Sequence, residues 1–160
     1  MHPEATRLIG IDPGLQKTGW GIIDISGTSL RLIGSGTIKP NPTKQIAERL
    51  KFLSQELDTV LHQYEPHHAA IEETFVNQNP TTSLKLGMAR GAAILTLANH
   101  NLSVAEYAPN KIKKSVTGQG HATKQQIGMM VKVLLPACGE LGEDEADALA
   151  IAITHAHYHK

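Results

Sequence analysis

The order of the apolar segments along the chain is the feature that most constrains its fold. Three short apolar segments come first, at 8–12, 20–24 and 31–39, and a turn containing Gly separates each from the next. Segments this short and this close in sequence predict three strands joined by hairpins. Beyond residue 39, helical and strand patterns alternate, which predicts a mixed sheet rather than a fully parallel one.

The helical and strand patterns of this second part are separated by clear breaks. Apolar residues recur at steps of three and four from Ile46 to Tyr64, which predicts an amphipathic helix that Pro66 ends. The remaining pattern predicts strands at 68–75 and 102–108, and helices at 81–99, from Pro109, at 123–135 and at 143–157. This order resembles the ribonuclease H-like fold, an α/β architecture in which helices flank a five-stranded mixed sheet.

Length and composition fit one domain. The 160 residues are 41% hydrophobic and only 4% aromatic, so we expect a single core of aliphatic side chains. The longest apolar run, Ala148 to Ile153, is too short to cross a membrane, and the N-terminus has no apolar signal segment. The one cysteine, Cys138, excludes an intrachain disulfide and a Cys-based zinc site. We therefore expect one cytoplasmic domain over residues 1–160, without a membrane partner.

Charge is segregated along the chain, although the net charge is zero. Residues 74–139 carry one acid, Glu106, whereas residues 140–160 carry five acids and one base, Lys160. Lysines usually lie on a solvated surface, but a basic segment nearly free of acids favours contact with phosphate groups. The basic residues of segment 74–139 are Lys85, Arg90, Lys111, Lys113, Lys114, Lys124 and Lys132.

Carboxylates follow two of the predicted strands. Asp12 ends the first strand and precedes a Pro-Gly turn, where it either caps the turn or opens onto a site at the sheet edge. Glu72 and Glu73 follow the apolar residues of strand 68–75. Adjacent strand residues point to opposite faces, so only one of the two glutamates can share a site with Asp12, and the pattern leaves open which.

Two further acids lie at the start of the last predicted helix. Asp144 and Asp147 are three residues apart, which places them on one helical face. Acids at a helix start often serve as caps, but Asp147 precedes the apolar run and must lie against the core. Carboxylate ligands select Mg²⁺ or Mn²⁺, and two such ions about 4 Å apart can activate water for phosphodiester hydrolysis.

Three segments resemble the signature sequences of the RuvC family of bacterial Holliday-junction resolvases. They are GIDPGLQKTGWGIID, AIEETFVNQNPTTSLKLGMARG and EADALAIAITHAH, in the family's order and over essentially the whole chain. The resemblance implies a ribonuclease H-like fold, a homodimer, and Mg²⁺- or Mn²⁺-dependent nicking of two like-polarity strands of a four-way DNA junction. It also implies ligatable 5′-phosphate and 3′-hydroxyl ends, a role in recombination and repair, and the RuvA–RuvB branch-migration complex as a partner.

The resemblance assigns roles to individual residues. It implies four catalytic acids that bind two metal ions per site, and it selects the first of the two adjacent glutamates: Asp12, Glu72, Asp144 and Asp147. Phe75 matches an aromatic residue that stacks on an unpaired junction base. Lys113 and Lys124 match basic positions near the scissile phosphate, and we expect further DNA contacts from Lys85 and Arg90. We expect the dimer interface on helix 81–99.

Two other classes of function fit part of the sequence. The first segment also resembles the phosphate-binding hairpin of actin-like ATPases and sugar kinases, but those enzymes close two such domains around a nucleotide. A non-catalytic junction-binding module is the second alternative, and the presence of all four acids argues against it. Glu73 and Glu145 add negative charge beside the ligands, and the alternating His155, His157 and His159 predict a frayed polar C-terminus rather than a metal site.

Overall fold

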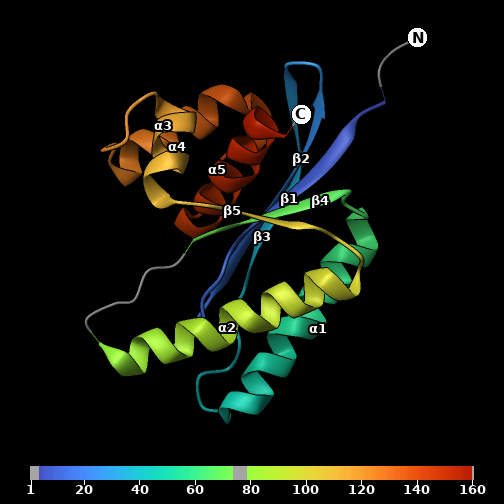
Figure 1. Cartoon of the computed structure of the whole chain (residues 1–160), viewed down its shortest axis with the longest axis vertical. Coiled ribbons are helices and arrows are strands. Elements are labelled where there is room, and N and C mark those ends of the chain that lie inside the picture. The colour runs from blue at the N-terminus through green and yellow to red at the C-terminus, as the bar shows by residue number, and fades with distance from the viewer. Residues whose placement is uncertain (1–3, 74–78, 160) are drawn as a thin grey trace.

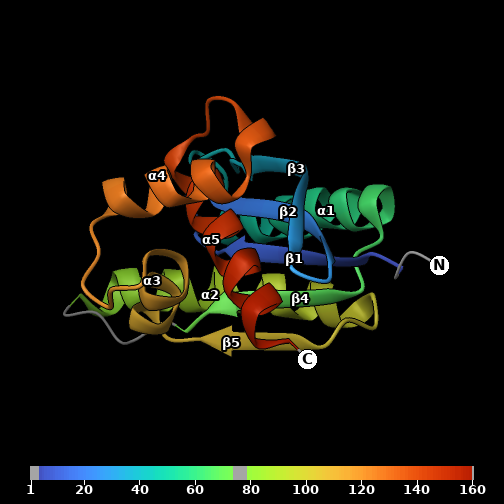
Figure 2. The same cartoon turned by 90° about the horizontal axis from the view of Figure 1, so that it is seen from above.

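A computed structural model describes residues 4–73 and 79–159 of the chain (Figure 1). The three predicted hairpin strands are β1 (Thr6–Asp12), β2 (Thr18–Ser26) and β3 (Ser29–Ile38), paired antiparallel. Two later strands extend the sheet: β4 (His68–Glu72) pairs parallel with β1, and β5 (Val104–Tyr107) pairs parallel with β4. The resulting order is β3-β2-β1-β4-β5 (Figure 2), which confirms the predicted five-stranded mixed sheet.

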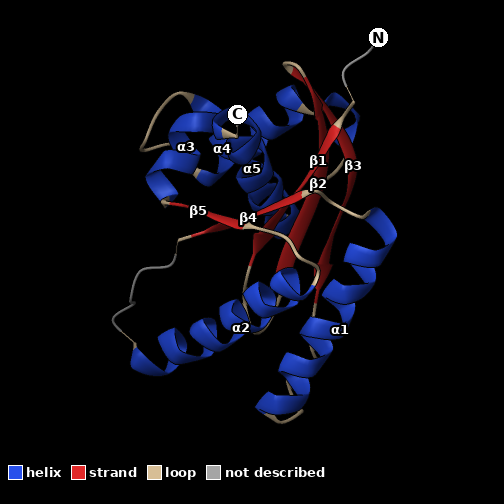
Figure 3. Cartoon of the chain, turned by 45° about the vertical axis from the view of Figure 1, so that its right-hand side comes forward, coloured by secondary structure: helices blue, strands red, loops and turns tan. Residues whose placement is uncertain are grey.

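Helices cover both faces of this sheet (Figure 3). One face carries α1 (Ile46–Tyr64) and α2 (Pro80–Asn99). The other carries α3 (Pro109–Thr117), α4 (Lys124–Leu134), the short 3-10 helix η1 (Pro136–Cys138) and α5 (Glu143–Tyr158). None of the helices in the described ranges is both long and apolar enough to cross a membrane.

Local sequence signals explain where the helices begin and end. Asn79 caps α2 by accepting hydrogen bonds from two backbone amides of the first turn, and a capping box between Thr123 and Gln126 starts α4. Gly118 takes a left-handed conformation, with φ of 83°, and ends α3. The boundaries therefore lie within a few residues of those that the sequence predicts.

Alternation along β1 sends its side chains into two separate cores. Leu8 packs with the helices α3–α5, whereas Ile9 and Ile11 pack with α1 and α2. The same alternation in β4 places Ala70 with the α5 core and Ile71 with the opposite core. The α5 face of both strands is thus the face on which the strand-terminal acids lie.

The C-terminal end of α5 differs from the prediction. The helix continues to Tyr158, and His155 is only 7% exposed, so the expected frayed polar end is wrong. Its imidazole Nδ1 lies 2.6 Å from the hydroxyl oxygen of Tyr107 on β5. Burial, followed by the neighbouring His159 and His68, lowers the pKa of His155 to about 4. Packing against the sheet, which residue spacing does not reveal, therefore turns this polar residue inward.

Direct contact with the backbone of β1 and β2 fixes the position of α5. A Cβ added at Gly10 would overlap the carbonyl oxygen of Ala148 and lie 2.7 Å from the amide nitrogen of Ala152. A Cβ at Gly19 would similarly overlap the carbonyl oxygen of Asp144. These two glycines let α5 approach the strands closely enough to bring its acids to the end of β1.

We expect Gly10→Ala to destabilise the protein by about 3 kcal/mol or more, because the added methyl meets backbone atoms that cannot move independently. Gly128→Ala, in α4, is the matched control because, in the part of the chain that the structure describes, no atom beyond the adjacent helix backbone lies within 4 Å of the added Cβ. Alanine is the better helix former, so this control is expected to leave stability unchanged or raise it by up to about 1 kcal/mol. Urea denaturation measures both, and equal stability of the two variants would contradict this packing account.

Candidate active site

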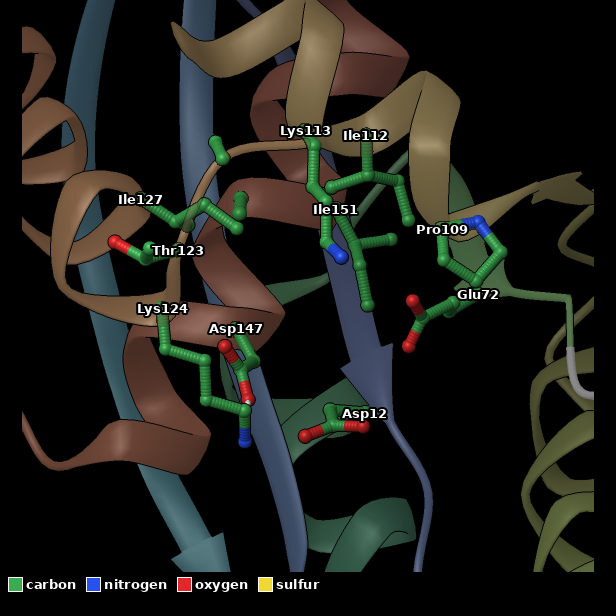
Figure 4. A pocket seen from close by; sticks show the side chains of 12 residues that line it. Asp12, Glu72, Pro109, Ile112, Lys113, Thr123, Lys124, Ile127, Asp147 and Ile151 are labelled. Carbon is green, nitrogen blue, oxygen red and sulfur yellow. Dashed lines mark ion pairs between the residues drawn. The ribbon is translucent and has the colours of Figure 1, made fainter. Parts of the chain in front are cut away.

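The parallel pairing of β1 and β4 brings two acids to the same edge of the sheet. Gly10 pairs with Ala70 and Ile11 with Ile71, so Asp12 and Glu72 follow at the ends of neighbouring strands. Both side chains lie on the face of their strands that packs against α5, and both line a cavity of about 460 Å³ (Figure 4). The next residue, Glu73, points to the opposite face of the strand and does not line this cavity. The register thus separates the two adjacent glutamates.

Helix α5 supplies the other two acids from its first turns. Asp147 lines the same cavity as Asp12 and Glu72. Asp144 lies on the other side of Asp12, in an adjoining cavity of about 450 Å³ that Asp12 also lines. The Oδ2 atom of Asp144 lies 3.2 Å from the ammonium of Lys17. The other three predicted acids therefore lie around Asp12, with Glu72 and Asp147 in one cavity and Asp144 in the other.

The carboxylates of the first cavity are hard to ionise together. Burial, followed by the nearby charges of Asp147, Glu72 and Asp144, raises the pKa of Asp12 to about 7 against the opposing effect of Lys124. Burial and Asp147 also raise the pKa of Glu72. The pKa of Asp147 is raised as well, mainly by burial. A bound cation would relieve both the burial cost and the mutual repulsion.

This donor set fits a hard divalent cation. All four candidate ligands offer carboxylate oxygens, which Mg²⁺ and Mn²⁺ prefer, and the described residues that line the first cavity include no cysteine or histidine. Asp12 lines both cavities, so it can contribute an oxygen on either side. The arrangement is suited to metal-assisted hydrolysis of a phosphate ester.

Two of the predicted basic residues face the acids. Lys113 on α3 and Lys124 on α4 line the first cavity (Figure 4). The ammonium of Lys124 lies 2.6 Å from a Glu143 oxygen and 3.8 Å from a carboxylate oxygen of Asp147. Lys85 lines the second cavity. The acids are therefore flanked by positive charge on both sides.

Arg90 has a different environment from the other predicted DNA contacts. Its guanidinium donates a 2.6 Å hydrogen bond to the backbone carbonyl of Glu72 and forms an ion pair with Glu106. The side chain is only 16% exposed. We therefore interpret Arg90 as a residue that positions the end of β4. Phe75 lies outside the described residues.

Sequence reasoning missed two basic residues of the second cavity. Lys17 and Arg49 line it together with Lys85. The terminal nitrogen of Arg49 donates to the carbonyl oxygen of Leu15 at 3.3 Å, and its buried Nε has no hydrogen-bond partner among the described residues. Lys17 follows Asp12 by only five residues, so its closeness to the site could have been predicted from the sequence. Arg49 reaches this position only through tertiary packing.

The side chain of Glu145 makes its contact outside the cavities of the other acids. The hydroxyl of Ser35, on β3, donates a 2.5 Å hydrogen bond to the Oε2 atom of Glu145. Glu145 lines neither of the cavities that Asp12 shares. The outer strand of the sheet therefore holds the side chain of Glu145 away from both cavities.

Comparisons with known proteins converge on one family. Residues 8–155 match the model of the family described as crossover junction endodeoxyribonuclease RuvC. A protein of that description from Brucella anthropi is 57% identical over 155 residues, which cover 97% of this chain and 90% of the relative. One from Sinorhizobium medicae is 58% identical over 151 residues, which cover 94% of this chain and 90% of the relative.

Solved structures agree with this result. The chain superposes on T. thermophilus RuvC in complex with a Holliday junction substrate with a TM-score of 0.90 and 32% identity, covering 96% of this chain and 94% of that one. The yeast mitochondrial Holliday junction resolvase Ydc2, at 14% identity and a TM-score of 0.68, covers 93% of this chain and 77% of its own and shares the fold. These matches confirm the predicted ribonuclease H-like fold.

Proposed function

The chain belongs to the family of the crossover junction endodeoxyribonuclease RuvC, and from this we propose that it resolves Holliday junctions by hydrolysing phosphodiester bonds. The observation that carries the proposal is the meeting of Asp12, Glu72 and Asp147 in one cavity, with Lys113 and Lys124 on its walls. Carboxylates can hold divalent ions there, and lysines can hold a phosphate beside them. Residues 1–160 would act as a single cytoplasmic nuclease domain.

The proposed cofactor is a pair of Mg²⁺ ions, with Mn²⁺ as a substitute, held by Asp12, Glu72, Asp144 and Asp147. When bound, the two ions supply an activated water and offset the charge that develops on the departing 3′-oxygen. Asp12 would contribute to both ions, because it lines both cavities. Its raised pKa means that it must lose a proton before it can bind metal, so we expect metal affinity to rise with pH through about 7.

The lysines stabilise the charge of the reacting phosphate. Lys113 lies on the cavity wall, while Lys124 is paired with Glu143 across an exposed surface. Solvent screens an exposed pair of this kind, so Lys124 can exchange Glu143 for a DNA phosphate. Lys85, Lys17 and Arg49 would hold the same DNA strand in the adjoining cavity. Phe75 remains a predicted base-stacking residue.

Two neighbouring lysines of α3 test this role. We expect Lys113→Ala to slow cleavage of a saturated junction by about 10²-fold, because it removes a positive charge from the cavity. Lys114→Ala removes the same charge from an exposed position that does not line the cavity, and is expected to stay within about threefold of wild type. Single-turnover rates measure both. Equal losses would mean that the lysines act through overall charge alone.

The proposed functional unit is a homodimer, because two symmetric cuts require two sites. Helix α2 carries an exposed apolar stripe that includes Leu84 and Leu95, and the latter is 62% exposed. Gly91 lies between them with open space around its Cα, so a second helix can approach closely. A second copy of α2 would bury this stripe, in agreement with the predicted interface on helix 81–99.

Leu95→Glu is expected to convert the dimer into monomers, because a charge would replace an apolar contact in the buried stripe. Met129→Glu is the matched control, since Met129 is equally exposed but lies on α4, on the opposite face of the sheet. Light scattering coupled to size-exclusion chromatography measures the mass of each. A dimeric Leu95→Glu protein, or a monomeric wild type, would contradict the α2 interface.

The products provide a direct test of the proposed reaction. On a mobile four-way junction, we expect nicks at symmetry-related positions in two strands of like polarity, and we expect DNA ligase to seal them without further processing. Ends that resist ligation, or cuts at unrelated positions, would contradict hydrolytic resolution. RuvA–RuvB is the proposed partner that moves the junction, and its addition is expected to shift the sites that are cut.

A further inference from the structure

A second group of potential metal ligands lies away from the acids. In the described part of the chain, the group of three whose donor atoms all lie within 4.8 Å of one another consists of Asp58, His62 and His100. Asp58 and His62 lie on α1, and His100 follows the end of α2. Helix α1 ends shortly before β4 begins, whereas Glu72 lies at the end of that strand. The group is therefore at the opposite end of the sheet from the acids.

This group lies at one end of a row of polar contacts between α1 and α2. The hydroxyls of Ser54 and Thr96 lie 2.7 Å apart, and one helical turn further on the Oδ1 atom of Asp58 lies 2.6 Å from Nε2 of His100. His62 is one turn further along α1. The C-terminal ends of both helices lie side by side on one face of the sheet (Figure 1), so these polar contacts hold the group in place.

The hydrogen bonds orient the ring nitrogens for metal binding. Nδ1 of His62 lies 2.8 Å from the backbone carbonyl of Asp58, which can only accept, so Nδ1 carries a proton and Nε2 is the nitrogen left to bind a metal. A backbone carbonyl in this role is typical of metal-binding histidines. The rings of His62 and His100 meet edge to face with centroids 4.8 Å apart. Glu65 lines the adjoining cavity of about 230 Å³ with both histidines, and offers a further carboxylate.

We propose that Asp58, His62 and His100 form a binding site for a divalent transition-metal ion of the Zn²⁺ class. Two imidazoles and one carboxylate suit zinc, with water or Glu65 as the fourth ligand. Ligand atoms around tetrahedral zinc lie about 3.3 Å apart, so these donors need to shift by only about 1 Å. The side chain of Asp58 is 49% exposed and His62 is exposed, so both can move. The ion replaces the proton shared by Asp58 and His100 and ties α1 to α2.

The test uses Zn²⁺ alone with the metal-free full-length protein. We expect calorimetric titration of wild type to show a zinc site that His62→Ala weakens by at least about tenfold. His62 is exposed, so this substitution leaves the core intact, and His121→Ala is the control for an exposed histidine elsewhere. Asp12→Asn is expected to keep the zinc site, which separates it from binding at the acids. Co²⁺ provides a second readout, because imidazole ligation changes its visible spectrum.

Each outcome decides the proposal. Zinc binding that persists in Asp12→Asn and is lost in His62→Ala, together with unchanged Mg²⁺-dependent junction cleavage by His62→Ala, supports it. Equal zinc affinity of wild type and His62→Ala overturns it, as does loss of the zinc site in Asp12→Asn. The result is independent of nuclease activity, since the two sites use different residues.

Discussion

Asp12→Asn is expected to reduce junction cleavage by on the order of 10³-fold or more while leaving junction binding intact or stronger. Among the described residues, Asp12 is the only one that lines both cavities, so its carboxylate can serve metal on either side. Asparagine keeps the shape but removes the charge that a divalent ion requires, and it also removes repulsion toward the DNA phosphates. Single-turnover cleavage in Mg²⁺ and binding in Ca²⁺ measure the two effects. Wild-type cleavage by this variant would exclude Asp12 from the site.

The same variant provides a stability test with a defined pH dependence. The pKa of Asp12 is raised to about 7, first by burial and then by Asp147, Glu72 and Asp144. An acid whose pKa is higher in the folded than in the unfolded protein stabilises the fold at pH values below its unfolded-state pKa, here near 4. This stabilisation is lost as the pH rises through the folded-state pKa of about 7. In EDTA, Asp12→Asn is therefore expected to be more stable than wild type at pH 8, by about 2–4 kcal/mol, with little difference at pH 4. A constant difference across this range would contradict the burial of a charged Asp12.

Adjacent glutamates are expected to respond very differently to the same substitution. Glu72→Gln should reduce cleavage by on the order of 10³-fold, because the carboxylate shares the cavity with Asp12 and Asp147. Glu73→Gln should remain within several-fold of wild type, because the strand alternation turns that side chain away from the cavity. The backbone amide of Glu73, which donates to the carbonyl oxygen of Tyr107, is unchanged in this variant.

The comparison of these two variants controls for net charge, since each removes one negative charge from neighbouring positions. Both are measured by single-turnover cleavage in Mg²⁺, with thermal melting to show that each protein is folded. A larger loss in Glu73→Gln than in Glu72→Gln would mean that the β1–β4 register in the active protein differs by one residue.

Much of the fold can be predicted from the sequence because its signals are local. The hairpin strands are short apolar runs between turns, and α1 shows a regular apolar stripe that buries Leu53, Leu57 and Val60. Asp12 and Asp147 could be identified as candidates because each directly borders an apolar segment. The choice between Glu72 and Glu73 depended on the family resemblance, and the sheet register supplies its physical reason.

The features that could not be predicted all depend on tertiary contacts. Arg49 belongs to the polar side of α1, and only the packing of that helix brings it to the second cavity. Arg90 resembles any other base of a basic segment until its contact with the Glu72 carbonyl is known. Asp58 and His100 are 42 residues apart, so no spacing in the sequence joins them. His155 becomes buried because α5 packs against the sheet.

We expect the four acids to form a metal-dependent site that is selective for DNA junctions, and a nicking assay is the strongest test of this site. A synthetic mobile four-way junction and a linear duplex of matched sequence are compared with Mg²⁺, Mn²⁺, Ca²⁺ and EDTA. We predict paired nicks in the junction alone, with Mg²⁺ or Mn²⁺, and none in EDTA. Equal cutting of the duplex would show a general nuclease, and binding without cutting in any of these metals would contradict the proposed catalytic function.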